Sequence, residues 1–163
     1  MNAFSREQAG AEFLKCCGST RWAESMTDAR PFTTPERLFE KADSVWRSLS
    51  TEDWLEAFRA HPKIGEKKAA ATQSEQAQAW SAQEQAGVEN ASTRTMADLA
   101  ERNREYEQRF GFIFIVCASG KSSEEMLAIL NGRMHNDRDT ELRIAAEEQR
   151  KITQLRLEKF LNR

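Results

Sequence analysis

The sequence predicts an all-α protein, a single-domain irregular helical bundle of about seven to nine helices over residues 1–163. Apolar residues recur at three- and four-residue spacing through most of the chain, which is the period of an amphipathic helix. Serine, threonine or proline stands where several of these stretches begin, as helix N-caps and first turns favour. Only one run has clear strand propensity, and no second strand is available to pair with it. These observations together favour helices packed around one core.

The N-terminal part of the chain predicts four helices. Ser5 and Gln8 have the spacing of a capping box, and Gly18 is typical of the residue that follows a helix. Thr34 precedes Pro35, and proline is favoured at the first helical position. The four predicted helices cover about 5–17, 19–26, 35–49 and 52–61.

The rest of the chain predicts three further helices, over about 96–110, 124–134 and 139–161. Residues 63–92 are small and polar without an apolar stripe, so a solvated helix or loop is expected there. The run "FIFIVCASG" at 112–120 favours a strand by propensity, but it has no partner. We therefore expect a buried extended stretch or an irregular helical turn.

Composition limits the classes of partner and location. The 24 Lys and Arg against 26 Asp and Glu give a net charge of −2, without the basic balance that nucleic-acid binding needs, so no nucleic-acid partner is expected. No apolar run is long enough to cross a membrane, and no signal-peptide pattern opens the sequence, which favours a cytoplasmic protein without membrane association. The cysteines lack ligand spacing and predict reduced, buried thiols, and we expect no metal.

His61 is a candidate acid or base, because an imidazole titrates near neutral pH. Taken alone, however, an isolated histidine at this position is more often one that interacts with carbonyls at a helix C-terminus. The second histidine, His135, stands among charged residues and is expected on the surface. Neither residue establishes a site without partners elsewhere in the chain.

Glu84 follows Ser81 with the spacing of a capping box, in the segment "SAQEQAG". One interpretation is a polar helical turn with Ser81 as its N-cap. The other is a local turn that presents Ser81, Glu84 and Gln85 to a ligand. Gly87 weakens a helix here, and the residues leave both interpretations open.

Four ordered segments resemble a known family. "HPKIG" at 61–65, "SAQEQAG" at 81–87, "FGFIFIVCASG" at 110–120 and "KITQLRLEKFL" at 151–161 are similar to motifs of the 2-oxo-4-hydroxy-4-carboxy-5-ureidoimidazoline (OHCU) decarboxylases of uric acid breakdown. Each motif is short, but their order and spacing match over nearly the whole chain. The resemblance implies an all-helical, homodimeric enzyme without a cofactor that converts OHCU to (S)-allantoin and CO₂.

The resemblance also assigns residues. It implies His61, Glu84 and Arg156 as catalytic, although an arginine on a charged helix would by itself be expected on the surface. The substrate-binding residues that it implies are Pro62, Ser81, Ala82, Gln83, Glu84, Gln85, Phe114, Ile115, Val116, Cys117, Ala118 and Arg156. For 114–118 the implied contacts are made by backbone groups.

The chemistry of such a substrate suits these residue types. A heterocycle that can delocalise the electrons left by CO₂ needs no separate electron sink, so no cofactor is expected. Arg156 offers a planar fork of donors for a carboxylate, while His61 and Glu84 can hold a hydroxyl and move its proton. The alternative is a non-catalytic helical interaction module on the same scaffold. Convergence of these side chains in one pocket would favour the enzyme.

Overall fold

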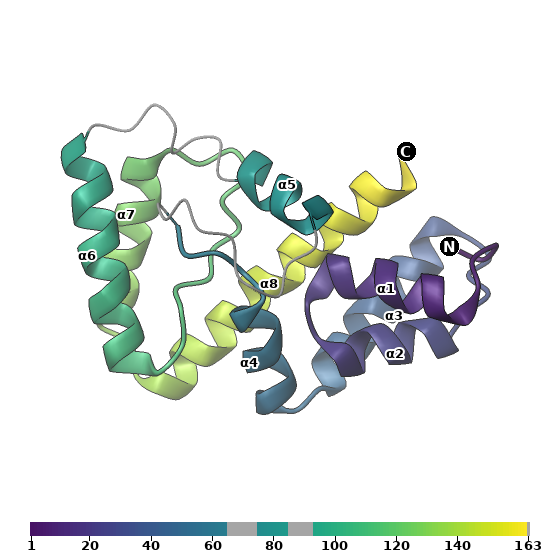
Figure 1. Cartoon of the computed structure of the whole chain (residues 1–163). Coiled ribbons are helices and arrows are strands. Elements are labelled where there is room, and N and C mark those ends of the chain that lie inside the picture. Colours follow the sequence, from purple (N-terminus) through teal and green to yellow (C-terminus); the bar gives the residue numbers. More distant parts are fainter. Residues whose placement is uncertain (65–74, 85–92, 163) are drawn as a thin grey trace.

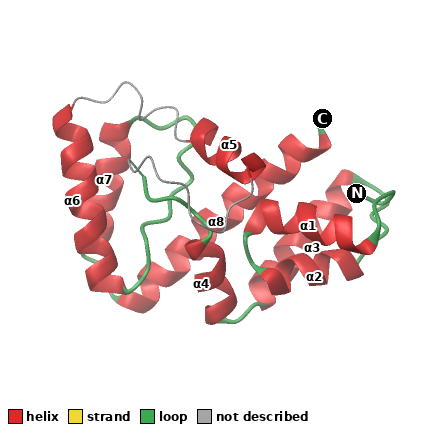
Figure 2. Ribbon diagram, viewed as in Figure 1, coloured by secondary structure: helices red, strands yellow, loops and turns green. Residues whose placement is uncertain are grey.

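The computed structural model describes residues 1–64, 75–84 and 93–162, and this part of the chain forms eight helices and no strand (Figures 1 and 2). The helices are α1 Arg6–Cys17, α2 Thr20–Asp28, α3 Pro35–Ser48, α4 Thr51–Arg59, α5 Glu75–Glu84, α6 Thr93–Phe110, α7 Ser123–Arg133 and α8 Arg138–Leu161. The prediction of an all-α fold with seven to nine helices is confirmed.

Local sequence signals set most helix boundaries. Ser5 Oγ accepts a hydrogen bond from the Gln8 N–H, and Gln8 Oε1 accepts one from the Ser5 N–H, which completes the predicted capping box of α1. Gly18 ends α1 with a φ of 86°, a backbone conformation that favours glycine. Thr34 caps α3, and Pro35 is its first residue.

Helix α5 corrects the prediction of a solvated polar segment. Its residues Ala77, Trp80, Ser81 and Glu84 are all buried. The expectation that Ser81 is an N-cap is wrong, because α5 begins at Glu75 and Ser81 lies inside it. Composition alone missed this burial, since a serine and a glutamate do not form an apolar stripe.

Helix α8 is the longest helix and crosses the molecule diagonally in Figure 1. It contacts α1, α3 and α4, while α6 packs against α7. Residues 111–122 run between the α6 and α7 pair and the rest of the molecule in Figure 1. Residues 113–118 of this segment form neither helix nor strand, and those from 114 to 118 are buried. The prediction of a buried non-helical stretch is therefore confirmed.

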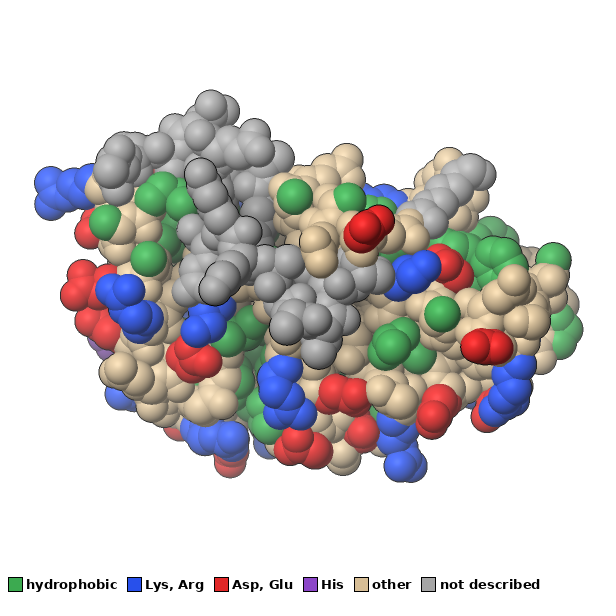
Figure 3. Space-filling view, viewed as in Figure 1, with side chains coloured by type: hydrophobic (Ala, Val, Ile, Leu, Met, Phe, Trp, Pro, Cys, Tyr) green, Lys and Arg blue, Asp and Glu red, His purple; other side chains and the backbone are tan. Residues whose placement is uncertain are grey.

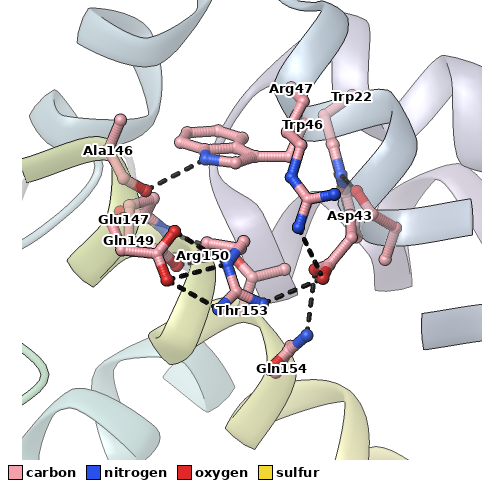
Figure 4. A network of polar contacts seen from close by, with 11 residues as sticks. Trp22, Asp43, Trp46, Arg47, Ala146, Glu147, Gln149, Arg150, Thr153 and Gln154 are labelled. Carbon is pink, nitrogen blue, oxygen red and sulfur yellow. Dashed lines mark hydrogen bonds and ion pairs between the residues drawn. The ribbon is translucent and has the colours of Figure 1, made fainter. Parts of the chain in front are cut away.

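A polar network fastens α8 to α3 (Figure 4). Arg150 donates to both carboxylate oxygens of Glu147 and, at 2.9 Å, to Asp43 Oδ2 on α3. Beside it, the indole N–H of Trp46 donates to the carbonyl of Ala146 at 3.0 Å. These contacts fix the position of α8 along α3, and thereby the positions of the residues further along α8.

Charge and thiols are distributed as the composition suggests. Lys and Arg side chains are mixed with Asp and Glu on the face seen in Figure 3, and neither sign gathers in one patch there. None of the helices in the described ranges combines the length and apolarity needed to cross a bilayer. Cys16, Cys17 and Cys117 are buried free thiols, as predicted.

Candidate active site

A small cavity of about 30 Å³ lies where α4, α5, α8 and the 114–118 segment meet. Polar and apolar side chains share its wall. The residues that line it are His61, Pro62, Ile64, Ser81, Glu84, Phe114, Ile115, Val116, Ala118 and Ile152. Four segments of the sequence that are distant from one another thus converge on one pocket.

Arg156 of α8 does not itself line this pocket, but it holds the lining residue Glu84 through a buried ion pair. Its Nε donates to Glu84 Oε1 at 3.0 Å and its Nη2 to Glu84 Oε2 at 2.9 Å, so the pair is bidentate. Arg156 Nη2 also donates to Ser81 Oγ at 3.1 Å. The Arg156 residue is only 2% exposed, and Glu84 is 8% exposed. The interpretation of Ser81 and Glu84 as a mere polar turn does not account for this pairing.

His61 lies just beyond the C-terminal end of α4. Its N–H donates to the carbonyl of Phe58 at 3.0 Å, and Pro62 follows it. The end of α4 packs closely on the turn after α1, because a Cβ on Gly18 would lie 2.6 Å from the Cβ of Ala60. A side chain at position 18 would therefore clash with the residue that precedes His61.

The environment of His61 favours the neutral imidazole. Burial, followed by the positive charge of Arg156, lowers its pKa from 6.5 to about 3, while the nearby Gln149 side chain acts in the opposite direction. Nε2 of His61 is buried and has no hydrogen-bond partner. A buried polar atom left unpaired is costly, so Nε2 is expected to gain a partner from a ligand or from a neighbouring side chain.

This low pKa predicts a pH dependence of stability. The unfolded chain binds a proton at His61 as the pH falls below 6.5, whereas the folded protein does not until about pH 3. As the pH is lowered from 6.5 to about 3, the free energy of unfolding is therefore expected to decrease. His61 contributes up to about 1.4 kcal/mol of this decrease per pH unit. Urea unfolding at pH 7, 6, 5 and 4 checks it. The slope should shrink in His61→Ala and persist in His135→Ala, and equal slopes would contradict the assignment.

The 114–118 wall of the pocket is held from behind by a buried network. Arg133 donates through Nη1 to the carbonyl of Ile115 at 2.7 Å and through Nε to Glu141 at 2.6 Å. The Tyr106 hydroxyl donates to the same carboxylate, and the guanidinium carbon lies 4.7 Å from the centre of the Phe114 ring. Burial and the neighbouring carboxylate raise the pKa of Tyr106, so its phenol stays protonated as the donor.

Both the sequence and the fold are similar to those of known proteins. A family model described as OHCU decarboxylase matches residues 2–158. The chain belongs to the OHCU decarboxylase family. A crystal structure of OHCU decarboxylase in the presence of (S)-allantoin has 38% sequence identity and a TM-score of 0.80, covering 93% of this chain and 98% of that one.

Two curated relatives are similar to this chain over most of its length. The uric acid degradation bifunctional protein TTL of Arabidopsis thaliana is 39% identical over 151 residues, which cover 93% of this chain and 47% of that protein. The OHCU decarboxylase of Amia calva is 31% identical over 142 residues, covering 85% of this chain and 79% of that protein. This chain thus spans less than half the length of the Arabidopsis relative.

The structure brings together most, but not all, of the residues that the family resemblance implies. Ala82 and Gln83 are exposed on α5 and do not line the pocket. Gln85 lies outside the described residues. Cys117 is not part of the lining either, since its N–H donates to Glu148 at 2.7 Å and its carbonyl accepts from Lys121.

Sequence reasoning missed several residues around the family's pocket. Ile64 and Ile152 line it, and Lys159 Nζ lies 3.8 Å from Glu84 Oε1. A further missed residue, Gln149, is fully buried two turns before Arg156 on α8. The available signal was its spacing, because Gln149 and Arg156 are seven residues apart and therefore share a helix face.

Proposed function

We propose that this protein decarboxylates OHCU to (S)-allantoin and CO₂ in uric acid degradation. The observation that carries the proposal is the convergence of the buried imidazole of His61 and the carboxylate of Glu84, which is paired with Arg156, on one pocket. A non-catalytic interaction module has no need of this combination, whereas proton transfer at a small substrate does.

His61 is proposed as the proton shuttle. Because its pKa of about 3 leaves it neutral at neutral pH, it begins as a proton acceptor. It takes the proton of the substrate hydroxyl as the bond to the carboxylate breaks and CO₂ departs. The electrons of that bond pass into the heterocycle, so no separate cofactor is needed. The imidazolium then returns its proton to the ring carbon, the ring nitrogen that received the electrons takes a proton from water, and the enzyme is restored.

Glu84 and Arg156 are proposed to orient the substrate and to stabilise developing charge. The bidentate pair presents one carboxylate in a fixed orientation at the pocket wall. A cavity of about 30 Å³ holds one or two water molecules, so an OHCU-sized ligand requires the wall side chains to separate. The substrate carboxylate is an anion that competes with Glu84 for the N–H groups of the Arg156 guanidinium. When it displaces Glu84, the side chains of the pocket wall separate.

The remaining binding roles rest on the family resemblance. We propose that Pro62, Ser81, Gln85 and the backbone of 114–118 contact the substrate. Ala82 and Gln83 are proposed only as members of the α5 segment that carries Ser81 and Glu84, because both side chains are exposed. Ala82→Gly and Gln83→Ala are poor probes of the site, since neither residue lines the pocket.

The decisive experiment supplies enzymatically generated OHCU to the purified protein and follows the circular dichroism of the product. The protein is expected to accelerate decay over the spontaneous reaction and to yield one enantiomer of allantoin. Decay at the spontaneous rate, with a racemic product, would overturn the proposed activity and favour the interaction module. Heat-denatured protein at the same concentration is the matched control.

Residues 1–163 are proposed to act as one domain that forms a homodimer in the cytoplasm. The continuous hydrophobic core, which includes residues from α1 to α8, supports one domain. Sedimentation equilibrium measures the dimer directly, and a single species with the mass of one chain at micromolar concentration would contradict it.

A further inference from the structure

Gln149 of α8 has its side-chain amide oriented by two acceptors. Its Nε2 donates to the carbonyl of Cys17 at 3.3 Å and to Thr153 Oγ1 at 3.3 Å. A reversed amide would set Oε1 against the Cys17 carbonyl, and two acceptors repel one another. Gln149 is fully buried, and Figure 4 shows it on α8 near Thr153. The direction in which Oε1 points is therefore fixed by the fold.

Two buried polar atoms at this place lack partners. Gln149 Oε1 accepts no hydrogen bond, and His61 Nε2 makes none. The two side chains are neighbours, because the His61 ring lies within the interaction range of the Gln149 side chain. One atom is an obligatory acceptor and the other is a donor whenever it carries hydrogen. The two atoms are therefore complementary as hydrogen-bond donor and acceptor.

We propose that Gln149 is a positioning residue for His61, whose Nε2–H donates to Gln149 Oε1, so that the lone pair of Nδ1 is left for the substrate. The contact fixes the tautomer and the ring orientation of a neutral histidine. It also places a partial negative charge beside the imidazolium that forms when His61 takes a proton, opposite in effect to the nearby Arg156. The catalytic part of this inference rests on the proposed function, whereas the tautomer does not.

The first test is nuclear magnetic resonance of the histidine ring nitrogens in protein labelled with ¹⁵N-histidine. The chain has two histidines, so His135→Gln assigns the signals. At neutral pH, His61 is expected to be one tautomer, protonated at Nε2, with a slowly exchanging ring hydrogen. Protonation at Nδ1, or a fast-exchanging mixture in the unaltered protein, would overturn the proposal whatever the activity of the enzyme.

The second test compares two variants of the same helix turn. Gln149→Met keeps the volume but removes the oxygen acceptor, and His61 is expected to become a mixture of tautomers. Thr153→Val removes one partner of the Gln149 amide nitrogen and leaves Oε1 in place, so the tautomer should persist. An unchanged tautomer in Gln149→Met would contradict the contact.

Steady-state kinetics with OHCU then separates positioning from folding. In Gln149→Met, kcat is expected to fall about tenfold or more, since a hydrogen bond to a group that becomes charged is lost, with KM within twofold. Thr153→Val should keep kcat within twofold. Equal losses in the two variants would assign Gln149 a structural role only. Absence of activity in the unaltered protein would instead reject the proposed function and leave the tautomer result standing.

Discussion

Replacing His61 by alanine is expected to lower kcat for OHCU decarboxylation by about 10² to 10⁴, the usual contribution of a positioned acid or base. The imidazole is neutral at neutral pH, so its free nitrogen is able to accept the hydroxyl proton and then release it. Its side chain makes no hydrogen bond that satisfies normal geometry, so the loss should not come from unfolding. Circular dichroism of allantoin formation measures the rate.

The matched control for His61→Ala is His135→Ala, because His135 is exposed and is the other histidine of the chain. Its rate should stay within twofold of the unaltered protein. If His61→Ala kept full activity, His61 would not be the proton shuttle, and Glu84 would be the remaining candidate for protonating the carbon. Far-ultraviolet spectra of both variants verify that the helices are retained.

Replacing Arg156 by methionine is expected to destabilise the protein by about 3–5 kcal/mol, because it leaves Glu84 as a buried charge without its partner. The same change should abolish measurable decarboxylation. Arg156→Lys should also be harmful, since an ammonium does not reproduce the bidentate contact with Glu84. Urea unfolding at pH 7 measures the free energy, and the OHCU assay measures the rate.

The cause of the lower stability of Arg156→Met is tested with the double variant Glu84→Leu, Arg156→Met. It should be more stable than Arg156→Met, because no isolated charge remains in the interior. Arg143→Met on the same helix is the control, and its exposed side chain predicts a change within about 0.5 kcal/mol. A double variant no more stable than Arg156→Met would show that lost packing, rather than the stranded carboxylate, causes the effect.

Features encoded locally were predictable from the sequence. The capping box of α1, the proline at the start of α3 and the glycine after α1 each depend on residues within one helical turn. The helical period and the missing strand partner similarly sufficed for the all-α fold. The buried stretch at 113–118 followed from the same reasoning, since a strand without a partner has unpaired backbone groups.

Features that depend on distant partners were not predictable from composition. Ser81 and Glu84 are buried because Arg156, on another helix, satisfies them. Without that partner, a serine and a glutamate in a polar segment are properly expected in water. The family resemblance singled out these residues as a group, but it did not single out Gln149, whose role depends on the Cys17 carbonyl and the His61 ring.

The buried ion pair also determines when the pocket can form during folding. Arg156 and Glu84 are 72 residues apart in sequence, and Arg156 reaches back 141 residues to the carbonyl of Lys15. Contacts between residues so far apart in the sequence form late, because closing a large loop costs conformational entropy. During synthesis, α8 leaves the ribosome after the seven other described helices. A nascent chain can therefore form α1 and α2 before Arg156 is available to pair with Glu84. The complete pocket forms only when α8 packs against the other helices.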